Sequence, residues 1–200
     1  MYPGLQARIR PQQPAFIMAQ SGETVTYAEL ERRSNRLAHF LRANGLGRLD
    51  HYSIFMENNA RYIECCSAGE RSGLYYTCIN SYLMPDEVAY ILENSESKIL
   101  ITSMAKRDAA LRAMAQCPRI EWCLVVDGPG DGGRAVNLDA VAGAFPTCRL
   151  RTSSSASPCS IRRARRAAPR EFCGPCRKTR RRERCRSSTS SRMRGASVKA

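Results

Sequence analysis

The sequence is poor in the residues and motifs that most directly mark a function. It has one tryptophan and two histidines, and His39 and His51 stand alone, as surface or packing histidines do. The phosphate-loop motif GxxxxGK[ST] is absent. No apolar run approaches the roughly 20 residues that a transmembrane helix needs, and the N-terminus has no apolar segment of the signal-peptide kind. We therefore expect a cytoplasmic protein without a transmembrane segment.

Positive charge is unevenly distributed along the chain. The formal net charge is +14, and a charge of that size favours a nucleic-acid or anionic-membrane partner when it covers a folded surface. Residues 1–150 hold equal numbers of basic and acidic side chains, so the whole excess lies in residues 151–200. We therefore do not expect a basic binding surface on the first part of the chain.

Residues 151–200 also lack apolar side chains. Of the aliphatic and aromatic types that form cores, the segment contains only Ile161, Phe172, Met193 and Val198. So few cannot offset the conformational entropy lost on folding. The composition predicts one folded domain over residues 1–146 and a basic, low-complexity, disordered tail over residues 147–200.

The stretch from Tyr52 to Ser81 predicts a strand, a helix and a second strand. Residues 52–56 form an apolar run typical of a strand that is buried on both faces. The polar residues 57–59 can accept hydrogen bonds from the first turn of a helix, and Gly73 ends that helix. A unit of this length implies parallel strands joined by a right-handed crossover.

Further predicted elements extend this unit on both sides. Thr26 and Glu29 form a capping box at the start of the longest predicted helix. In chain order, the other elements are a strand over 15–19 that Val25 closes into a hairpin, the capped helix up to Gly45, a helix from Pro85, a strand over 98–102, a helix over 104–115 and a strand over 123–127. We predict an α/β fold: a partial doubly wound, mostly parallel sheet flanked by helices.

Ligands of such sheets bind beyond the carboxyl ends of the strands. Those ends are residues 57–59, residues 80–81, Ser103 and residues 127–133. The glycine-rich run 127–133 could cradle a phosphate, although we favour a plain surface loop. Because none of these ends carries a recognisable catalytic constellation, we assign no catalytic, cofactor-binding or metal-binding residue.

Three segments, in order, carry a resemblance to a known family. They are TYAELERRSNRLAHFL, MENNARYIE and AGERSGLYYTCINSYLMPDEVAYILENSESKILITS. Together they resemble the N-terminal part of AMP-forming acyl-CoA synthetases, which belong to the adenylate-forming enzymes. The resemblance covers about Ala15 to Asp127, and its specificity comes from several matches in the same order.

The resemblance implies an acid–thiol ligase. Such an enzyme uses ATP and magnesium to convert a fatty or other carboxylic acid to an acyl-adenylate, and then transfers the acyl group to the thiol of coenzyme A. The family's phosphate loop ending in Pro-Lys-Gly, its aromatic-Gly-x-Thr-Glu stretch, its ribose-binding Asp and its C-terminal Lys are not present as written. We therefore expect an inactive N-terminal fragment that binds none of these cofactors.

The genetic code offers an explanation for the missing phosphate loop. If residues 152–179 are translated one base out of register, allowed codons give the alternative sequence DELLGFAMLYSSGTTGRPKGILRPLPEN. This contains YSSGTTGRPKG, the family's phosphate loop, at about the expected distance downstream. Residues 185–200 can similarly give MPLFDFLQDAWRQREG. Our hypothesis is a frame slip near residues 146–148, after which the chain is not selected protein sequence.

Two alternatives rest on the tail. Its arginines could contact nucleic acid in a basic binding protein, but aromatic interleaving is nearly absent and no specific nucleic-acid partner is indicated. Cys173 and Cys176 form a CxxC like that of thioredoxins, and with Cys159 and Cys185 they could ligate zinc, yet no apolar strand and no second close pair accompanies them. We favour an accidental origin for both motifs.

The cysteines of the first part are expected to be buried free thiols. They are Cys65, Cys66, Cys78, Cys117, Cys123 and Cys148. Most of them lie inside apolar elements, where a small thiol packs like any other hydrophobic side chain. Without a secretory signal, no disulfide framework is inferred.

Overall fold

A computed structural model describes residues 3–150 of the chain. The segment with the hypothesised frame slip, the CxxC of Cys173 and Cys176 and nearly all of the predicted tail therefore lie outside the described residues. The first residues of that tail lie inside them. Asn35 donates to the Thr147 carbonyl at 2.7 Å, and His39 Nε2 donates to the Cys148 carbonyl at 2.8 Å.

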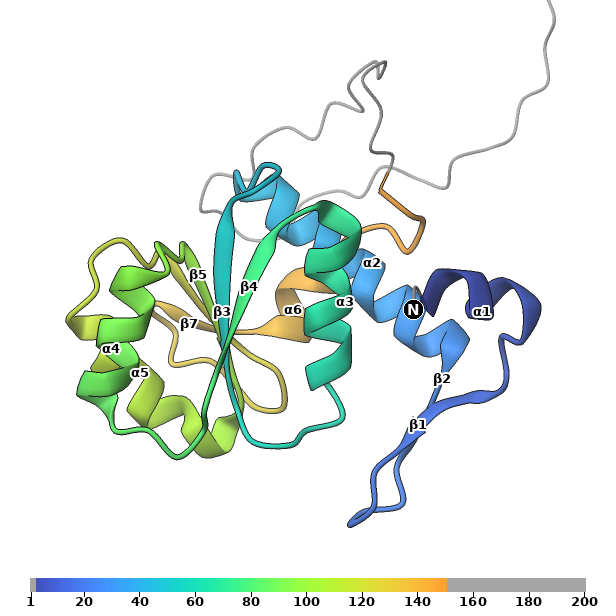
Figure 1. The fold of residues 1–200 in the computed structure, drawn as a ribbon, viewed down its shortest axis with the longest axis horizontal. Helices are drawn as coiled ribbons and strands as arrows, with labels where there is room; N and C mark the ends of the chain where they lie inside the picture. Colours follow the sequence, from blue (N-terminus) through green and yellow to red (C-terminus); the bar gives the residue numbers. More distant parts are fainter. Residues whose placement is uncertain (1–2, 151–200) are drawn as a thin grey trace, which may run out of the picture. The chain divides into compact units, whose positions relative to one another are not determined.

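The centre of the fold is a five-stranded sheet in which every neighbouring pair of strands is parallel. The strands are β3 (His51–Phe55), β4 (Tyr75–Ile79), β5 (Ile99–Thr102), β6 (Trp122–Val125) and β7 (Ala135–Asn137). Their order in the sheet is β4-β3-β5-β6-β7 (Figure 1). The chain runs from β3 outward to β4 and then returns past β3 to β5. The winding therefore reverses between β3 and β5, which confirms the predicted doubly wound sheet.

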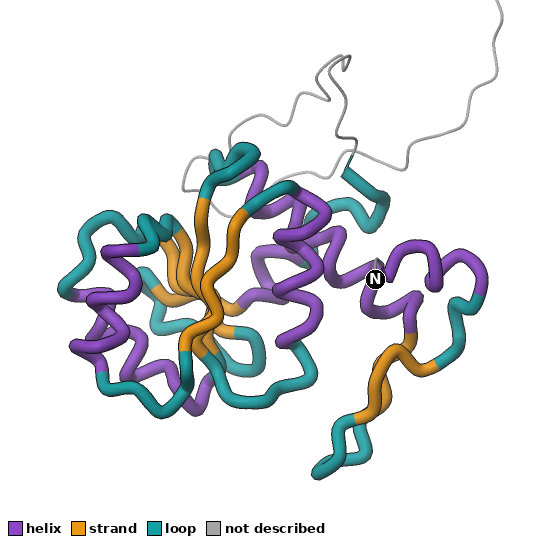
Figure 2. Tube along the Cα trace, viewed as in Figure 1, coloured by secondary structure: helices purple, strands orange, loops and turns teal. Residues whose placement is uncertain are grey.

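Helices cover both faces of the sheet, as Figure 2 shows in purple around the orange strands. The helices are α1 (Pro3–Ile9), α2 (Tyr27–Ala43), α3 (Tyr62–Ser72), α4 (Pro85–Asn94), α5 (Arg107–Ala115) and α6 (Leu138–Ala142), with a 3-10 turn η1 at Met104–Lys106. An antiparallel hairpin of β1 (Pro14–Ile17) and β2 (Thr24–Thr26) precedes α2. Within residues 3–150, none of the helices combines the length and apolar composition that crossing a membrane requires.

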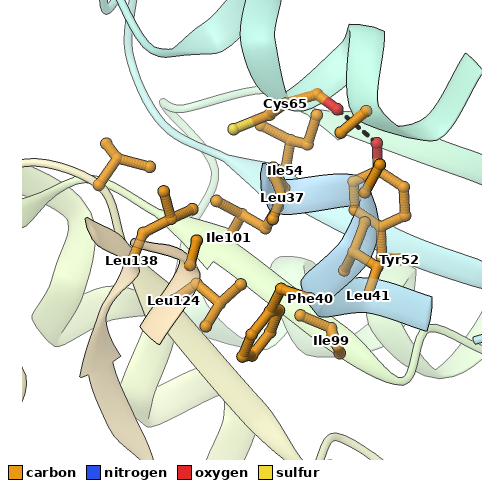
Figure 3. Packing of buried hydrophobic residues seen from close by; sticks show 14 of the residues in the cluster. Leu37, Phe40, Leu41, Tyr52, Ile54, Cys65, Ile99, Ile101, Leu124 and Leu138 are labelled. Atoms are coloured by element: carbon orange, nitrogen blue, oxygen red, sulfur yellow. Dashed lines mark hydrogen bonds between the residues drawn. The ribbon is translucent and has the colours of Figure 1, made fainter. Parts of the chain in front are cut away.

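Alternate residues of the inner strands feed two separate cores. Ile54, Ile101 and Leu124 pack with α2, α3 and α6 on one face (Figure 3). Phe55 and Leu100 point to the other face, where they pack with α4 and α5. Because successive side chains of a strand point to opposite faces, a strand covered on both sides needs an unbroken apolar run. The apolar run over residues 52–56 therefore predicted the inner strand correctly.

The start of α2 follows the predicted capping only in part. The Thr26 side chain accepts a hydrogen bond from the backbone N–H of Glu29 at 3.3 Å. The Glu29 carboxylate, however, pairs with Arg32 and Arg33 instead of returning to the N-cap N–H. Two guanidinium groups at the next turn attract the carboxylate more strongly than one neutral amide does. The predicted reciprocal box is therefore half correct.

Three short elements were not predicted. Helix α1 contains a proline and a glycine and leaves Leu5 and Ile9 exposed, so its sequence shows no clear apolar face. Strand β7 has three residues and α6 has five, which is too short for a periodic pattern to emerge. Both follow the glycine-rich run, which we had interpreted only as a loop.

The prediction of buried cysteines holds for three of the six. Cys65, Cys117 and Cys123 are buried, whereas Cys66 is half-buried and Cys78 and Cys148 are exposed. Cys78 lies in β4, and this strand forms the edge of the sheet. Since an edge strand is covered by a neighbour on one side only, its side chains keep more contact with solvent.

Candidate functional site

A groove of about 640 Å³ lies at the carboxyl edge of the sheet. Four segments and one side chain of α2 line it: the hairpin turn between β1 and β2, the loop after β3, the end of β6 and the junction of β7 with α6. The lining residues are Met18, Gln20, Ser21, Glu23, Arg33, Asn58, Asn59, Ala60, Arg61, Val126, Asp127, Gly128, Asn137 and Asp139. The groove thus occupies the part of a doubly wound sheet where ligands usually bind.

Hydrogen bonds join three of the predicted strand ends. The Ser103 hydroxyl donates to Glu57 at 2.5 Å, which links the ends of β5 and β3. Asp127 accepts from the Asn59 amide at 3.1 Å and from the backbone N–H of Met104 at 2.6 Å. These three strand ends therefore lie together at one edge of the sheet.

The strand end at residues 80–81 stays outside the groove. The Asn80 side chain accepts a hydrogen bond from the backbone N–H of Tyr82 at 3.0 Å and closes a turn there. This turn leads into α4, whose first proline was predicted correctly. Glu87 accepts from the backbone N–H of Met84 at 2.8 Å and so caps that helix.

Arg61 is the centre of the polar network in the groove. Its guanidinium makes two hydrogen bonds of 2.8 Å to Glu64 and bonds of 2.7 and 2.8 Å to Asp139. It also donates to the Val126 carbonyl at 3.1 Å. One side chain thereby ties the start of α3 to the end of β6 and to the start of α6. Arginine suits this position because its planar group can pair with two carboxylates at once.

The two carboxylates around Arg61 are in different environments. Burial raises the pKa of Glu64, whose side chain is 2% exposed, and the nearby Arg61 and Arg33 offset part of that effect. The Asp139 side chain is 65% exposed, and its hydrogen bonds to Arg61 lower its pKa. Although burial acts against it, the bonds to Asp139 and Glu64 raise the pKa of Arg61. Arg61 is therefore a fixed charge that organises both acids.

The glycine-rich loop after β6 is held by hydrogen bonds from its own backbone to one of its side chains. Gly128, Gly130 and Gly133 have the spacing GxGxxG, but the element that follows them in the chain is the strand β7 and not a helix. The Asp131 carboxylate accepts from the backbone N–H of Gly133 at 2.8 Å and of Ala135 at 3.1 Å. These bonds lower the pKa of Asp131. An internal carboxylate thus engages two backbone amides at the end of the loop, which agrees with the surface-loop interpretation.

Several donors near the carboxyl edge of the sheet are already engaged within the protein. The backbone N–H groups of Gly133 and Ala135 serve Asp131, and the Arg61 guanidinium serves two carboxylates. Over residues 3–150, the structure contains no group of three or more His, Cys, Asp and Glu side chains that could hold a metal ion. We therefore derive no step of phosphate or magnesium chemistry from this part of the chain.

The two histidines lie away from the groove. His39 is on α2, where its ring contacts the Cys148 carbonyl. His51 is the first residue of β3, at the opposite edge of the sheet, and its ring lies 5.0 Å from that of Tyr75. Both positions agree with the packing role that the sequence favoured.

Several residues of the groove were not predicted as site residues. Arg61 and Glu64 stand one turn into the segment after β3, and arginine followed three residues later by glutamate was the available signal for an ion pair on one helix face. Asp139 belongs to α6, which was itself missed. The hairpin turn at residues 18–23 reaches the groove only through the tertiary fold, so the sequence offered no signal for it.

The family model for AMP-binding enzymes matches residues 5–159. This chain belongs to the AMP-binding enzyme family. The match includes all of the sheet and every segment that lines the groove. It confirms the resemblance to AMP-forming acyl-CoA synthetases that the sequence showed.

Individual relatives agree with the family. The chain is 30% identical over 137 residues to the 3-oxocholest-4-en-26-oate–CoA ligase of Rhodococcus rhodochrous, covering 68% of this chain and 24% of that protein. It is 34% identical over 94 residues to the fatty acid–[acyl-carrier-protein] ligase ScoC of Streptomyces coeruleorubidus, covering 47% of this chain and 18% of that protein. The chain thus spans about a quarter or less of the length of these relatives.

A solved structure shows the same fold. The anthranilate CoA ligase AuaEII, in complex with anthranoyl-AMP, superposes with a TM-score of 0.68 at 18% identity. The superposition covers 77% of this chain and 29% of that ligase. At this identity the likeness establishes the arrangement of strands and helices, and it agrees with the α/β fold predicted from the sequence.

Proposed function

We propose that this chain derives from an ATP-dependent acid–thiol ligase that activates a carboxylic acid. The observation that carries the proposal is the family match over residues 5–159, which includes the sheet and the groove. The relatives act in the same chemical class: one is named as a coenzyme A ligase and another as an acyl-carrier-protein ligase. Fatty or other small-molecule carboxylic acids are therefore the proposed substrates, in a cytoplasmic setting.

The proposed reaction has two steps. The carboxylate oxygen of the acid attacks the α-phosphorus of ATP, which forms the acyl-adenylate and releases pyrophosphate. The thiol of coenzyme A then attacks the acyl carbon, which forms the thioester and releases AMP and a proton. The names of the relatives include two different acceptors, coenzyme A and an acyl-carrier protein. The choice of coenzyme A is therefore a narrower proposal than the formation of the acyl-adenylate.

We further propose that the chain as written does not perform this reaction by itself. The family's phosphate loop is not present as written, and allowed codons supply it only in the neighbouring reading frame of residues 152–179. The family match ends at residue 159, and the composition changes in the same region. The described residues give no support to the alternative of a nucleic-acid-binding protein, since all of the excess charge lies beyond them.

Two measurements test the proposal. Sequencing the gene should show codons after position 151 whose neighbouring frame encodes YSSGTTGRPKG; codons that forbid this frame would refute the slip. The chain as written should then be compared with a restored protein. This protein is expressed from the gene after a single-base insertion or deletion returns residues 152 onward to the neighbouring frame. Pyrophosphate exchange into ATP with a panel of carboxylic acids should appear only for the restored protein.

A matched variant makes the comparison specific. In the restored protein, replacing the lysine of the Pro-Lys-Gly motif with alanine should remove most of the exchange while the thermal melt stays the same. Acyl-adenylate formation by the chain as written would contradict its proposed inactivity. A restored protein that folds but activates none of the acids would contradict the proposed ligase function.

A further inference from the structure

Helix α3 packs unusually closely on the edge strand β4. At Gly69 a Cβ atom would lie 2.9 Å from Cδ1 of Tyr76, and it would also collide with the ring of Tyr52. The Tyr52 hydroxyl donates to the Cys65 carbonyl at 2.6 Å and holds the helix backbone at this distance. Only a residue without a side chain allows this approach. The spacing between α3 and β4 is thus set by contacts that leave little freedom.

The close packing brings two cysteines together. Tyr76 packs on the α3 side of the sheet, and Cys78, two residues further along β4, points to the same face. The chain turns back at Gly73, so α3 and β4 run in opposite directions. With Gly69 above Tyr76, the preceding turn of α3 places Cys66 above Cys78. Burial raises the pKa of Cys66 and of Tyr62, and the nearby Cys78 side chain adds to both effects, so the three side chains are neighbours.

The two thiols differ in their surroundings. Cys78 is exposed on the edge strand, whereas Cys66 is half-buried under α3. Burial, together with the charge of a neighbouring Cys78 thiolate, raises the pKa of Cys66 to about 12. Cys66 is therefore the covered, protonated member of the pair at neutral pH, and Cys78 is the member that solvent and small disulfides can reach. The exposed member is the nucleophile, and the covered member is in place to react second.

We propose that Cys66 and Cys78 are a redox-sensitive pair that forms a reversible disulfide between α3 and β4 when a low-molecular-weight disulfide such as oxidised glutathione is present. The Cys78 thiolate attacks one glutathione sulfur and releases the first glutathione. The Cys66 sulfur, after losing its proton, attacks the Cys78 sulfur of the mixed disulfide and releases the second. Two protein thiols are oxidised, one glutathione disulfide is reduced, and both protons end on the released glutathione molecules.

Peptide mapping of the full chain tests the pair directly. After incubation with oxidised glutathione and alkylation of the remaining thiols, trypsin separates residues 62–71 from residues 72–98, because it cuts after Arg61, Arg71 and Lys98. Mass spectrometry should find these two peptides linked as the main product of Cys78. Dithiothreitol should release them. A wild-type chain in which Cys78 carries only glutathione, or links mainly to another cysteine, would overturn the proposal.

Two variants separate Cys66 from its neighbour in the same peptide. Cys66→Ser should lose the link and leave Cys78 as a stable mixed disulfide with glutathione. Cys65→Ala should keep the link, because Cys65 lies in the core on another side of α3. A link that survives in Cys66→Ser would assign the bond to Cys65 and refute the pair.

In the wild-type chain, oxidation should also raise the thermal midpoint by about 5 °C, since the bond closes a short loop. An unchanged or lower midpoint would refute the claim that the bond fits the native packing.

Discussion

Arg61 and Asp139 stand 78 residues apart in the sequence, and their side chains meet in a two-fold hydrogen-bonded ion pair of 2.7 and 2.8 Å. The pair joins the loop after β3 to the first turn of the last described helix, α6. It also fixes Arg61 so that its remaining donors reach Glu64 and the Val126 carbonyl. The shape of the groove at the carboxyl edge therefore depends on a contact between two segments that are far apart in the sequence.

Replacing Arg61 with alanine should destabilise the protein substantially. Glu64, which is 2% exposed, would keep only the more distant Arg33 at 3.8 Å. Leaving a buried charge without its main partner costs about 3–5 kcal/mol. Urea unfolding of Arg61→Ala should show a loss of that order.

The matched control for this loss is a second change at Glu64. Arg61→Ala combined with Glu64→Gln removes the buried charge, so the double variant should recover part of the stability of Arg61→Ala. If the double variant is no more stable than Arg61→Ala, the cost does not come from the unpaired carboxylate.

The Asp139 pair should contribute to stability in a pH-dependent way. The hydrogen bonds to Arg61 lower the pKa of Asp139 below its ordinary value of 3.8. A group with a lowered pKa in the folded state stabilises the protein above its ordinary pKa, and this contribution is lost as the pH falls through the folded value. Thermal midpoints of Asp139→Asn should therefore fall less steeply below about pH 4 than those of the wild-type chain. Asp108→Asn, which changes an exposed aspartate on α5, should keep the wild-type slope; equal slopes in all three proteins would contradict the prediction.

The close approach of α3 to the sheet predicts that Gly69→Ala is destabilising. In an exposed helix interior alanine is usually the more stable residue, by about 1 kcal/mol. Here the added methyl group would collide with Tyr76 and Tyr52, and overpacking of this kind costs about 1–3 kcal/mol. Gly47→Ala is the control, since the nearest atom to its Cβ would be Asp50 Oδ2 at 3.7 Å. Chemical denaturation should show a loss for Gly69→Ala alone, and a gain at position 69 would show that the helix can move away.

The end of α3 should depend on the backbone of Gly73. Its φ angle of +68° lies in the left-handed region, which costs a residue with a side chain roughly 1–2 kcal/mol. Gly73→Ala should lose about that much stability in urea unfolding, whereas Gly73→Asn should lose less, because asparagine tolerates this conformation better. Equal losses for the two variants would assign the effect to crowding against Arg48 instead.

Much of the sheet was accessible from local patterns. The apolar run over residues 52–56, the glycine at position 73 and the proline at position 85 each act on their own segment, so their effects can be predicted without tertiary information. The same is true of the strand ends, because parallel strands bring their carboxyl ends to one edge whatever the details of packing. Four of the five strands and the clustering of Glu57, Ser103 and Asp127 followed from such arguments.

Other features depended on partners far away in the sequence. The spacing of Glu29 to Arg32 and Arg33 was a local signal for their ion pairs, but nothing near Arg61 indicates Asp139, whose helix α6 is too short for a periodic pattern. The exposure of Cys78 follows from the position of β4 at the edge of the sheet. The sequence gives the order of the strands along the chain but not their order in the sheet. The close approach of α3 to β4 depends on Gly69, whose missing side chain matters only because Tyr52 and Tyr76 lie beneath it.

The sequence by itself determined the class of fold, the edge where a ligand site belongs, the resemblance to the adenylate-forming enzymes and the division between a charge-balanced domain and an arginine-rich end. These properties depend on periodicity, composition and the order of motifs, all of which are local or additive. Only the tertiary structure decided that Arg61 pairs with Asp139, that Asp131 binds two backbone amides at the end of the glycine-rich loop, and that α3 packs closely on β4 at Gly69. Such contacts depend on how separate elements pack, and packing is set by the shapes of all the neighbours together.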